Sequence, residues 1–160
     1  MEQAILTNMC MIYRRETGQV VVQHRRGHWG GCAFPGGHVE PGEALVPSVI
    51  REVWEETGLT IEKPVLCGIK HWYRPGGVRY LVFLYAADRF SGELVPETCE
   101  GRVEWVRLEE LSDLPLADTF LPMAEIMAAG LGVPFSNGHP GCHEYFFEPK
   151  EGEAWVEQFY

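Results

Sequence analysis

Short apolar runs that alternate with polar residues follow one another along most of the chain, and this pattern predicts a protein rich in β-strands. The predicted strands are residues 4–13, 20–24, 61–73, 78–87 and 103–106, and a short segment at 32–34 follows the basic loop of residues 25–31. Arg74-Pro75-Gly76-Gly77, between two of these runs, is a good hairpin turn. The tail alternates apolar pieces with turn residues, so late hairpin strands are expected around residues 135–138 and 145–147.

In two other segments, the residue pattern predicts helices instead. The first has an apolar stripe that can anchor a helix to a core, formed by Val46, Val49, Ile50 and Val53. Pro47 falls in the first turn of this helix, where a missing N–H costs nothing. The second helix is predicted at residues 122–130. Together with the strands, these segments predict a mixed sheet with a helix on each side.

Three glutamates of the first predicted helix, Glu52, Glu55 and Glu56, are spaced i, i+3 and i+4. That spacing places their carboxylates on one face of the helix, where like charges repel one another. A hard divalent cation removes the repulsion, because Mg²⁺ binds through carboxylate oxygens, water and substrate phosphates. A Glu-rich helix is otherwise most often a solvated face, so the residues around these three decide between the two interpretations.

Those residues stand in a fixed register. Gly37 is followed six residues later by Glu43, and Arg51-Glu52-Val53-Trp54-Glu55-Glu56-Thr57-Gly58-Leu59 begins eight residues after that. This is the pattern of the Nudix box, here at residues 37–59, and every defining position is met, so the chain resembles the Nudix hydrolases. The resemblance implies an α/β (α+β) fold, an α/β/α sandwich with a mixed β-sheet. It also implies hydrolysis of a nucleoside diphosphate linked to another group.

In the Nudix hydrolases this loop and helix hold divalent cations. The residues that match, and that are expected to act as metal ligands and catalytic residues, are Glu52, Glu55, Glu56 and the Gly36 carbonyl. The expected metal is Mg²⁺, with Mn²⁺ as the alternative. Arg51 is counted with the catalytic residues because it lies beside this face and can pair with Glu43, fixing the loop against the helix.

Glu100 is the candidate outside the box, both as a metal ligand and as a catalytic residue. It lies five residues before Trp105, and related nucleoside triphosphatases place a metal-binding or catalytic Glu in a comparable loop. Site residues favour loops, although the structural alternative is a solvated carboxylate. Glu97 and Glu104 are rivals, and Glu104 is the weaker because strand alternation can point it outward.

Beyond the box, the order of elements resembles the MutT-type triphosphatases, especially those that clear oxidised purine nucleotides such as 8-oxo-dGTP. The stretches that carry this resemblance are residues 34–37, 100–106 and 156–160. It implies hydrolysis of a nucleoside triphosphate, with an oxidised purine as the leading candidate, to a monophosphate and pyrophosphate. One departure is Ala33, near the place where the mammalian enzyme has a base-binding Asn.

The candidate substrate contacts are Trp29, Phe34, Asn8, Asp118 and Arg25. Asp118 falls where the mammalian enzyme has base-reading acids. Trp29 lies in a glycine-containing loop and, like Phe34, can stack on a base, although aromatic residues of strands are more often core. Arg25 can touch phosphate, and Asn8 on the first strand can face the pocket.

Two further readings of the function are open. One keeps the chemistry and changes the group attached to the diphosphate, giving ADP-ribose, a dinucleotide polyphosphate, a pterin triphosphate or capped RNA as substrate. The other is a Nudix-fold sensor that binds a nucleotide without turnover. Such proteins usually lose box carboxylates, whereas this chain keeps them all.

At 160 residues with 46% apolar content, the chain fits one domain over residues 1–160. A formal charge of −10 argues against a nucleic-acid surface, and no apolar run has membrane-spanning length, so neither partner is expected. The five cysteines form no CxxC pair, which favours reduced thiols in a cytoplasmic protein. The expected partner is a small-molecule nucleotide. A homodimer is left open, since many relatives dimerise.

Overall fold

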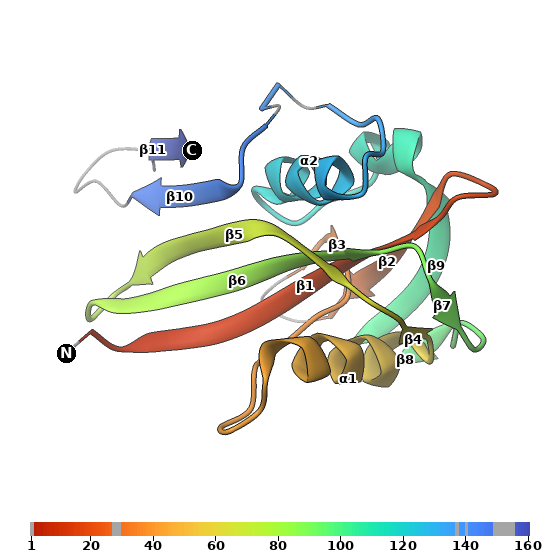
Figure 1. Cartoon of the computed structure of the whole chain (residues 1–160), viewed down its shortest axis with the longest axis horizontal. Helices are drawn as coiled ribbons and strands as arrows, with labels where there is room; N and C mark the ends of the chain where they lie inside the picture. The colour runs from red at the N-terminus through yellow and green to blue at the C-terminus, as the bar shows by residue number, and fades with distance from the viewer. Residues whose placement is uncertain (1, 27–29, 137, 140, 149–155) are drawn as a thin grey trace.

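The computed structural model describes residues 2–26, 30–136, 138–139, 141–148 and 156–160, and it has a mixed sheet with a helix on each face (Figure 1). This confirms the fold class predicted from the sequence. The helices are α1 (Leu45–Thr57) and α2 (Phe120–Gly130), with a 3-10 helix at Leu108–Asp113. The strands are β1 (Ala4–Arg14), β2 (Gln19–Arg25), β3 (Cys32–Ala33), β4 (Thr60–Ile61), β5 (Val65–Arg74), β6 (Val78–Ala87), β7 (Phe90–Ser91), β8 (Glu97–Thr98), β9 (Gly101–Arg107), β10 (Glu144–Glu148) and β11 (Val156–Phe159).

Most strands join one large sheet. Within the described residues its hydrogen-bonded order is β11-β10-β5-β6-β1-β2-β9-β8, and β3 adds to β2. β1 and β6 run parallel from Ala4↔Arg79 to Ile12↔Ala87, and β10 runs parallel to β5, whereas β1–β2 and β5–β6 are antiparallel. The N-terminal strand β1 therefore lies in the middle of the sheet, between the next strand in the sequence, β2, and the much later strand β6.

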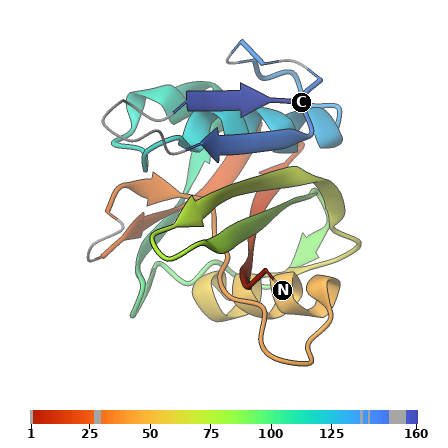
Figure 2. The same ribbon diagram turned by 90° about the vertical axis from the view of Figure 1, so that its left-hand side faces the viewer.

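Each face of the sheet carries its own hydrophobic core. Val49 and Val53 of α1 are fully buried against one face, and Ile126 of α2 is buried against the other. Successive side chains of a strand point to opposite faces, so β1 serves both cores: Cys10 packs on the α1 side and Met11 on the α2 side. Figure 2 shows the two helices on opposite sides of the strands.

Helix α1 ends where glycine allows a left-handed cap. Gly58 has φ +76°, and its N–H donates to the Trp54 carbonyl at 2.8 Å. The predicted apolar stripe is narrower than the sequence suggested, because Val49 and Val53 face the sheet whereas Val46 is 43% exposed. The opposite side of the helix is left free for its carboxylates.

The predicted strand at 61–73 is two strands. β4 ends at Ile61 and β5 begins at Val65, because Lys63 has φ +47° and Pro64 lacks the N–H that a ladder needs. β4 then pairs with β7, a short strand that the sequence pattern did not predict. The hairpin between β5 and β6 at residues 74–78 is confirmed.

The C-terminal strands extend one edge of the sheet. β10 pairs with β5 from Glu144↔Ile69 to Phe147↔Trp72, and β11 pairs with β10, which confirms a strand at 145–147. Phe135 is in no strand; it packs against the α2-side core instead, and Asn137 lies outside the described residues. Of the helices that the structure describes, none combines the length and apolar character required to cross a bilayer.

Candidate active site

The loop of residues 34–44 before α1, hereafter the glycine loop, runs against the central strand β1. The Asn8 N–H donates to the Gly37 carbonyl at 2.8 Å, and the Cys10 N–H donates to the Pro35 carbonyl at 2.9 Å. A Cβ on Gly36 would lie 2.2 Å from the Asn8 carbonyl oxygen, and the φ of Gly36 is +154°. Only glycine fits this approach, which explains the first glycine of the pair.

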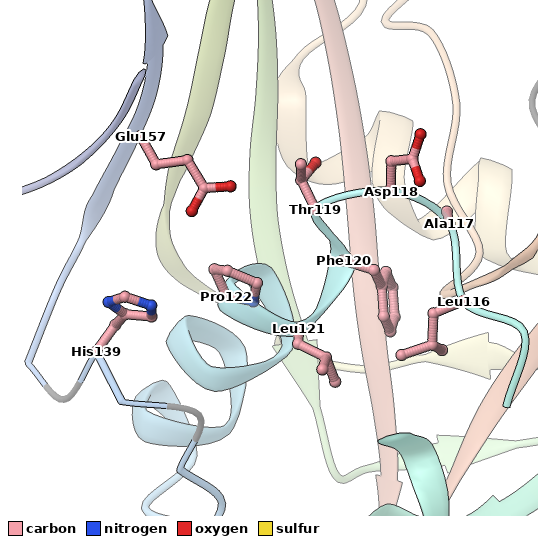
Figure 3. Close-up of a pocket in the computed structure, with 9 residues that line it drawn as sticks. All are labelled: Leu116, Ala117, Asp118, Thr119, Phe120, Leu121, Pro122, His139 and Glu157. Carbon is pink, nitrogen blue, oxygen red and sulfur yellow. The ribbon is translucent and has the colours of Figure 1, made fainter. Parts of the chain in front are cut away.

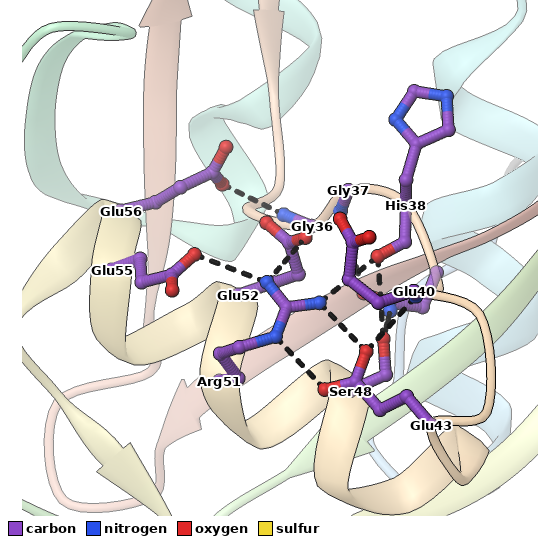
Figure 4. A network of polar contacts seen from close by, with 11 residues as sticks. Gly36, Gly37, His38, Glu40, Glu43, Ser48, Arg51, Glu52, Glu55 and Glu56 are labelled. Atoms are coloured by element: carbon purple, nitrogen blue, oxygen red, sulfur yellow. Dashed lines mark hydrogen bonds and ion pairs between the residues drawn. The ribbon is translucent and has the colours of Figure 1, made fainter.

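Arg51 gathers three of the glutamates around one guanidinium (Figure 4). It donates to both carboxylate oxygens of Glu43 at 2.8 Å, the pair that the sequence predicted. It also donates to Glu52 at 2.8 Å and to Glu55 at 3.1 Å. A further bond of 3.1 Å reaches the His38 carbonyl. The guanidinium fork suits this two-pronged contact, so Arg51 joins the glycine loop to α1.

Glu56 is held by the glycine loop rather than by Arg51. Its Oε2 accepts the Gly36 N–H at 2.8 Å. Burial, together with the charges of Glu52 and Glu100, raises the pKa of Glu56 to about 7 against the lowering effect of the Gly36 bond. Burial also raises the pKa of Glu52, whereas the bonds from Arg51 lower the pKa of Glu43 to about 2. Glu52 and Glu56 are therefore carboxylates that a nearby cation would stabilise in the charged form.

The donors at this site fit a hard divalent cation. Glu52, Glu55 and Glu56 offer only oxygen atoms, which are the ligands that Mg²⁺ and Mn²⁺ prefer. Gly37 leaves room for one of them, since a Cβ there would lie 2.5 Å from Glu52 Oε2. Across the residues that the structure describes, no three acidic, histidine or cysteine side chains converge as ready ligands. Arg51 bonds Glu52 and Glu55 in this structure, as Figure 4 shows.

Replacing Arg51 by lysine is expected to lower kcat/KM by about 10-fold. Removing a group that orients metal ligands typically costs about 10- to 100-fold, and this change falls at the lower end of that range. A single ammonium cannot hold Glu43, Glu52 and Glu55 together as the guanidinium fork does. Steady-state kinetics on the preferred nucleotide would measure the change. The matched control is Arg107→Lys, because the exposed Arg107 forms an ion pair with Glu109, two residues away in the sequence. Equal kcat/KM in both variants would contradict the positioning role.

Glu100 lies at the turn between β8 and β9, with an exposed side chain. Its charge contributes to the raised pKa of Glu56, so the two carboxylates are near enough to interact. The Arg26 N–H donates to the Glu100 carbonyl at 3.1 Å, which ties the turn to the end of β2. The rivals Glu97 and Glu104 both form ion pairs on the sheet. Glu100 thus remains the candidate outside α1.

Asn8 lies on the α1 side of β1 and supports the loop. Its side chain is 3% exposed, its Nδ2 donates to Ser48 Oγ at 3.0 Å, and its Oδ1 accepts the Gly37 N–H at 3.4 Å. The amide therefore connects β1, the glycine loop and α1. The amide is thus engaged on the α1 side, and a contact of Asn8 with substrate stays a prediction.

The remaining candidates are placed differently from one another. Phe34 is 2% exposed and meets the Phe120 ring edge-on at 4.7 Å, so it is a core residue of the α2 side rather than an open stacking surface. Arg25 ends β2, where burial lowers its pKa and the charge of Glu56 opposes this. Among the described residues, its Nε has no hydrogen-bond partner. Trp29 lies outside the described residues.

Asp118 lines a pocket of about 400 Å³ at the start of α2 (Figure 3). The pocket is formed by residues 116–122 together with His139 and Glu157. Two backbone hydrogen bonds tie its loop wall to β3: Cys32 donates to the Pro115 carbonyl at 2.7 Å, and Ala117 donates to the Cys32 carbonyl at 2.9 Å. Since β3 leads directly into the glycine loop, the chain connects this loop wall to the loop before α1.

Lys70 lies at the same pocket, although the sequence did not single it out. It is 7% exposed, and its Nζ donates to Thr119 Oγ1. The ammonium lies 5.2 to 5.3 Å from the ring centroids of Trp72, Tyr145 and Phe147. Burial lowers the pKa of Lys70 to about 8, opposed by the charges of Glu157 and Asp118. The signal in the sequence is a lysine two residues before Trp72, on the same face of a strand.

Comparison with known proteins gives related sequences. Residues 6–129 match the family described as NUDIX domain. The chain is 31% identical over 128 residues to the uncharacterized Nudix hydrolase YvcI of Bacillus subtilis (strain 168), covering 78% of this chain and 79% of that protein. It is also 35% identical over 98 residues to the nucleoside diphosphate-linked moiety X motif 6 protein of Mus musculus. That match covers 58% of this chain but only 31% of the mouse protein.

Solved structures share the fold. The mMutator MutT protein from Bacillus halodurans superposes with a TM-score of 0.73 at 22% identity, covering 97% of each chain. The MutT NUDIX hydrolase from Burkholderia pseudomallei gives a TM-score of 0.66 at 27% identity, covering 78% of this chain and 98% of that one. The sequence match includes the glycine loop and all of α1. The chain belongs to the Nudix hydrolase family.

Proposed function

We propose that this Nudix hydrolase cleaves a nucleoside triphosphate to the monophosphate and pyrophosphate in a reaction that depends on Mg²⁺ or Mn²⁺. The observation that carries the proposal is the set of oxygen donors on one face of α1, with Glu56 bonded to the glycine loop at 2.8 Å. An oxidised purine nucleotide such as 8-oxo-dGTP is the leading substrate. The pocket beside β3, with Asp118 in its wall, supports a base-binding role.

Glu52, Glu55 and Glu56 would hold the cation, together with the Gly36 carbonyl. The carbonyls on either side of Gly36 both accept from β1, at 2.9 and 2.8 Å, which supports a separate use for the one between them. Glu100 would add a carboxylate from the β8–β9 turn. A cation bound there supplies a Lewis acid that polarises phosphoryl oxygens and compensates the charge of the leaving diphosphate.

The chain itself supplies positioning, which dominates phosphoryl transfer. Arg51 holds Glu52 and Glu55 on one side of α1 and anchors the loop through Glu43. Arg25 would donate to a phosphate oxygen, a role supported by the effect of the Glu56 charge on its guanidinium and, among the described residues, by its unpartnered Nε. The pocket at the start of α2 would receive the base.

A substrate panel with Mg²⁺ at equal concentrations tests this function. It would contain the four dNTPs, 8-oxo-dGTP, ADP-ribose and a diadenosine polyphosphate, with pyrophosphate and orthophosphate measured separately. We expect kcat/KM for 8-oxo-dGTP to exceed that for the other nucleotides by about 10-fold or more, the discrimination that a few hydrogen bonds supply. The products should be the monophosphate and pyrophosphate.

The other results of the panel point elsewhere. Equal, slow hydrolysis of every triphosphate would remove the oxidised purine while keeping the reaction. Preference for ADP-ribose or the dinucleotide would assign the enzyme to another group of Nudix substrates. Binding without hydrolysis of any member would favour a nucleotide sensor and overturn the proposed activity.

A further inference from the structure

Two buried hydrogen-bond donors lie near Thr119, on the α2 side of the sheet. The Lys70 ammonium has three N–H bonds, and within the described residues its hydrogen-bond partner is Thr119 Oγ1. The Tyr145 hydroxyl belongs to a residue that is 0% exposed, and among the same residues no hydrogen bond of normal geometry reaches it. Burial raises its pKa, and the nearby Glu157 and Thr119 side chains also act on it. A buried donor without an acceptor destabilises the fold, so both groups are suited to a ligand. The pocket of Figure 3 with these two groups is hereafter the Lys70 pocket.

Two carboxylates border the same space. Asp118 and Glu157 line the pocket, and both raise the pKa of Lys70, so they lie near its ammonium. Neither forms an ion pair with Lys70 in the part of the chain that the structure describes. A group inserted between them must accept from Lys70 and donate to a carboxylate. An ionised phosphate can only accept, and an apolar ring can do neither.

The surroundings favour a flat ligand with a carbonyl group. Trp72 stacks on Tyr80 with ring centroids 4.5 Å apart, and three aromatic rings surround the Lys70 ammonium. A carbonyl oxygen has two lone pairs and can accept from Lys70 and Tyr145 together, whereas a ring nitrogen has one lone pair. An N–H next to that carbonyl would then face a carboxylate.

We propose that the Lys70 pocket selects bases with a lactam edge, an adjacent C=O and N–H as in hypoxanthine, guanine and uracil. Lys70 and Tyr145 donate to the carbonyl oxygen, and Asp118 accepts from the N–H. Lys70 is then the residue that determines base preference. This inference rests on the proposed nucleotide hydrolysis, because it names the kind of base that the nucleotide carries.

The Lys70 pocket is connected with the carboxylate site through Arg25. The charge of Glu56 acts on Arg25, and the charge of Arg25 acts on Lys70. Arg25 is therefore near enough to interact with both Glu56 and Lys70. A nucleotide with its base against Lys70 can place its phosphates beside Arg25 and α1.

The test compares ITP with ATP, which differ only in a lactam or an amidine edge on the same purine. The wild-type enzyme should prefer ITP by about 10- to 100-fold in kcat/KM, the range expected from one or two hydrogen bonds in a buried site. In Lys70→Met the preference should fall to about 1- to 3-fold. The loss should come from a higher KM for ITP with kcat unchanged, as for a contact made equally in the ground and transition states.

Lys63→Met is the matched control. Lys63 is exposed, so this substitution makes the same chemical change outside the pocket. It should keep the wild-type preference. Lys70→Met should also stay folded. Burial lowers the pKa of Lys70 to about 8, so the charge is less stable in the folded protein than in the unfolded chain, and its loss should not lower Tm. Equal kcat/KM for ITP and ATP in the wild type, or an unchanged preference in Lys70→Met, would overturn the inference.

A failure of the proposed hydrolysis can be distinguished from a failure of this inference. If the wild type hydrolyses no triphosphate, calorimetric titration with IMP and AMP still reports on the pocket. Tighter binding of IMP that is lost in Lys70→Met supports the lactam preference without any turnover. Equal affinities for IMP and AMP reject it.

Discussion

Glu56→Gln is expected to lower kcat by about 10²- to 10³-fold while the protein stays folded, the size of effect seen when one electrostatic group is removed from an active site. Glutamine keeps the shape of Glu56 and can still accept the Gly36 N–H, but it removes a charged oxygen donor from the proposed cation site. Kinetics with excess Mg²⁺ would measure the loss. Glu62→Gln, at an exposed position after β4, is the matched control. Activity within a few-fold of wild type in Glu56→Gln would contradict the ligand role.

The same variant has a second readout in the pH dependence of stability. The pKa of Glu56 is about 7 in the folded protein, above its ordinary value of 4.5. The folded state therefore binds more protons between these values, and the stability that Glu56 contributes is present below pH 4.5 and lost as the pH rises through 7. Without added divalent metal, Glu56→Gln should have a higher Tm than wild type at pH 8. Equal Tm values there would contradict the burial of this charge.

Gly36→Ala is expected to lower Tm by on the order of 10 °C, which corresponds to about 3 to 4 kcal/mol for a domain of this size. A Cβ at Gly36 would lie 2.2 Å from the Asn8 carbonyl oxygen. That atom belongs to the backbone of the central strand, so it cannot move without disturbing the bonds between β1 and the glycine loop. Differential scanning calorimetry would measure the shift.

Gly37→Ala provides the matched comparison. The nearest atoms to a Cβ there belong to the Glu52 carboxylate, the closest at 2.5 Å, and a side chain can rotate away. We expect a small loss of Tm with a large loss of activity, because Glu52 would leave its place. If Gly36→Ala and Gly37→Ala lowered Tm equally, close backbone packing would not be the reason for the first glycine.

The sequence predicted the elements better than their arrangement. The apolar run at 78–87 coincides with β6, because residues 84–87, at its C-terminal end, are buried on both faces and such a segment shows in hydrophobicity alone. The parallel pairing of β1 with β6 depends on contacts between distant residues, which a local pattern does not contain. The break at Lys63 and Pro64 was readable in part, since Pro64 stands inside the predicted strand.

The site shows the same division. Glu52, Glu55 and Glu56 share one helix, so their spacing was enough to place them together. Asn8 was assigned to the pocket although its amide turns toward Ser48, because strand parity could not be fixed before the sheet was known. Lys70 was overlooked for a related reason. Its contacts come from α2 and β10, which lie far away in the sequence and meet it only in the folded chain.

The family match ends at residue 129, whereas β10 and β11 follow it and supply Tyr145 and Glu157 to the Lys70 pocket. Lys70 and Asp118, the other two groups proposed to hold the base, lie inside that match. If the proposed base selection is correct, substitutions in the terminal hairpin would change which nucleotide is accepted while α1 and its carboxylates stay in place.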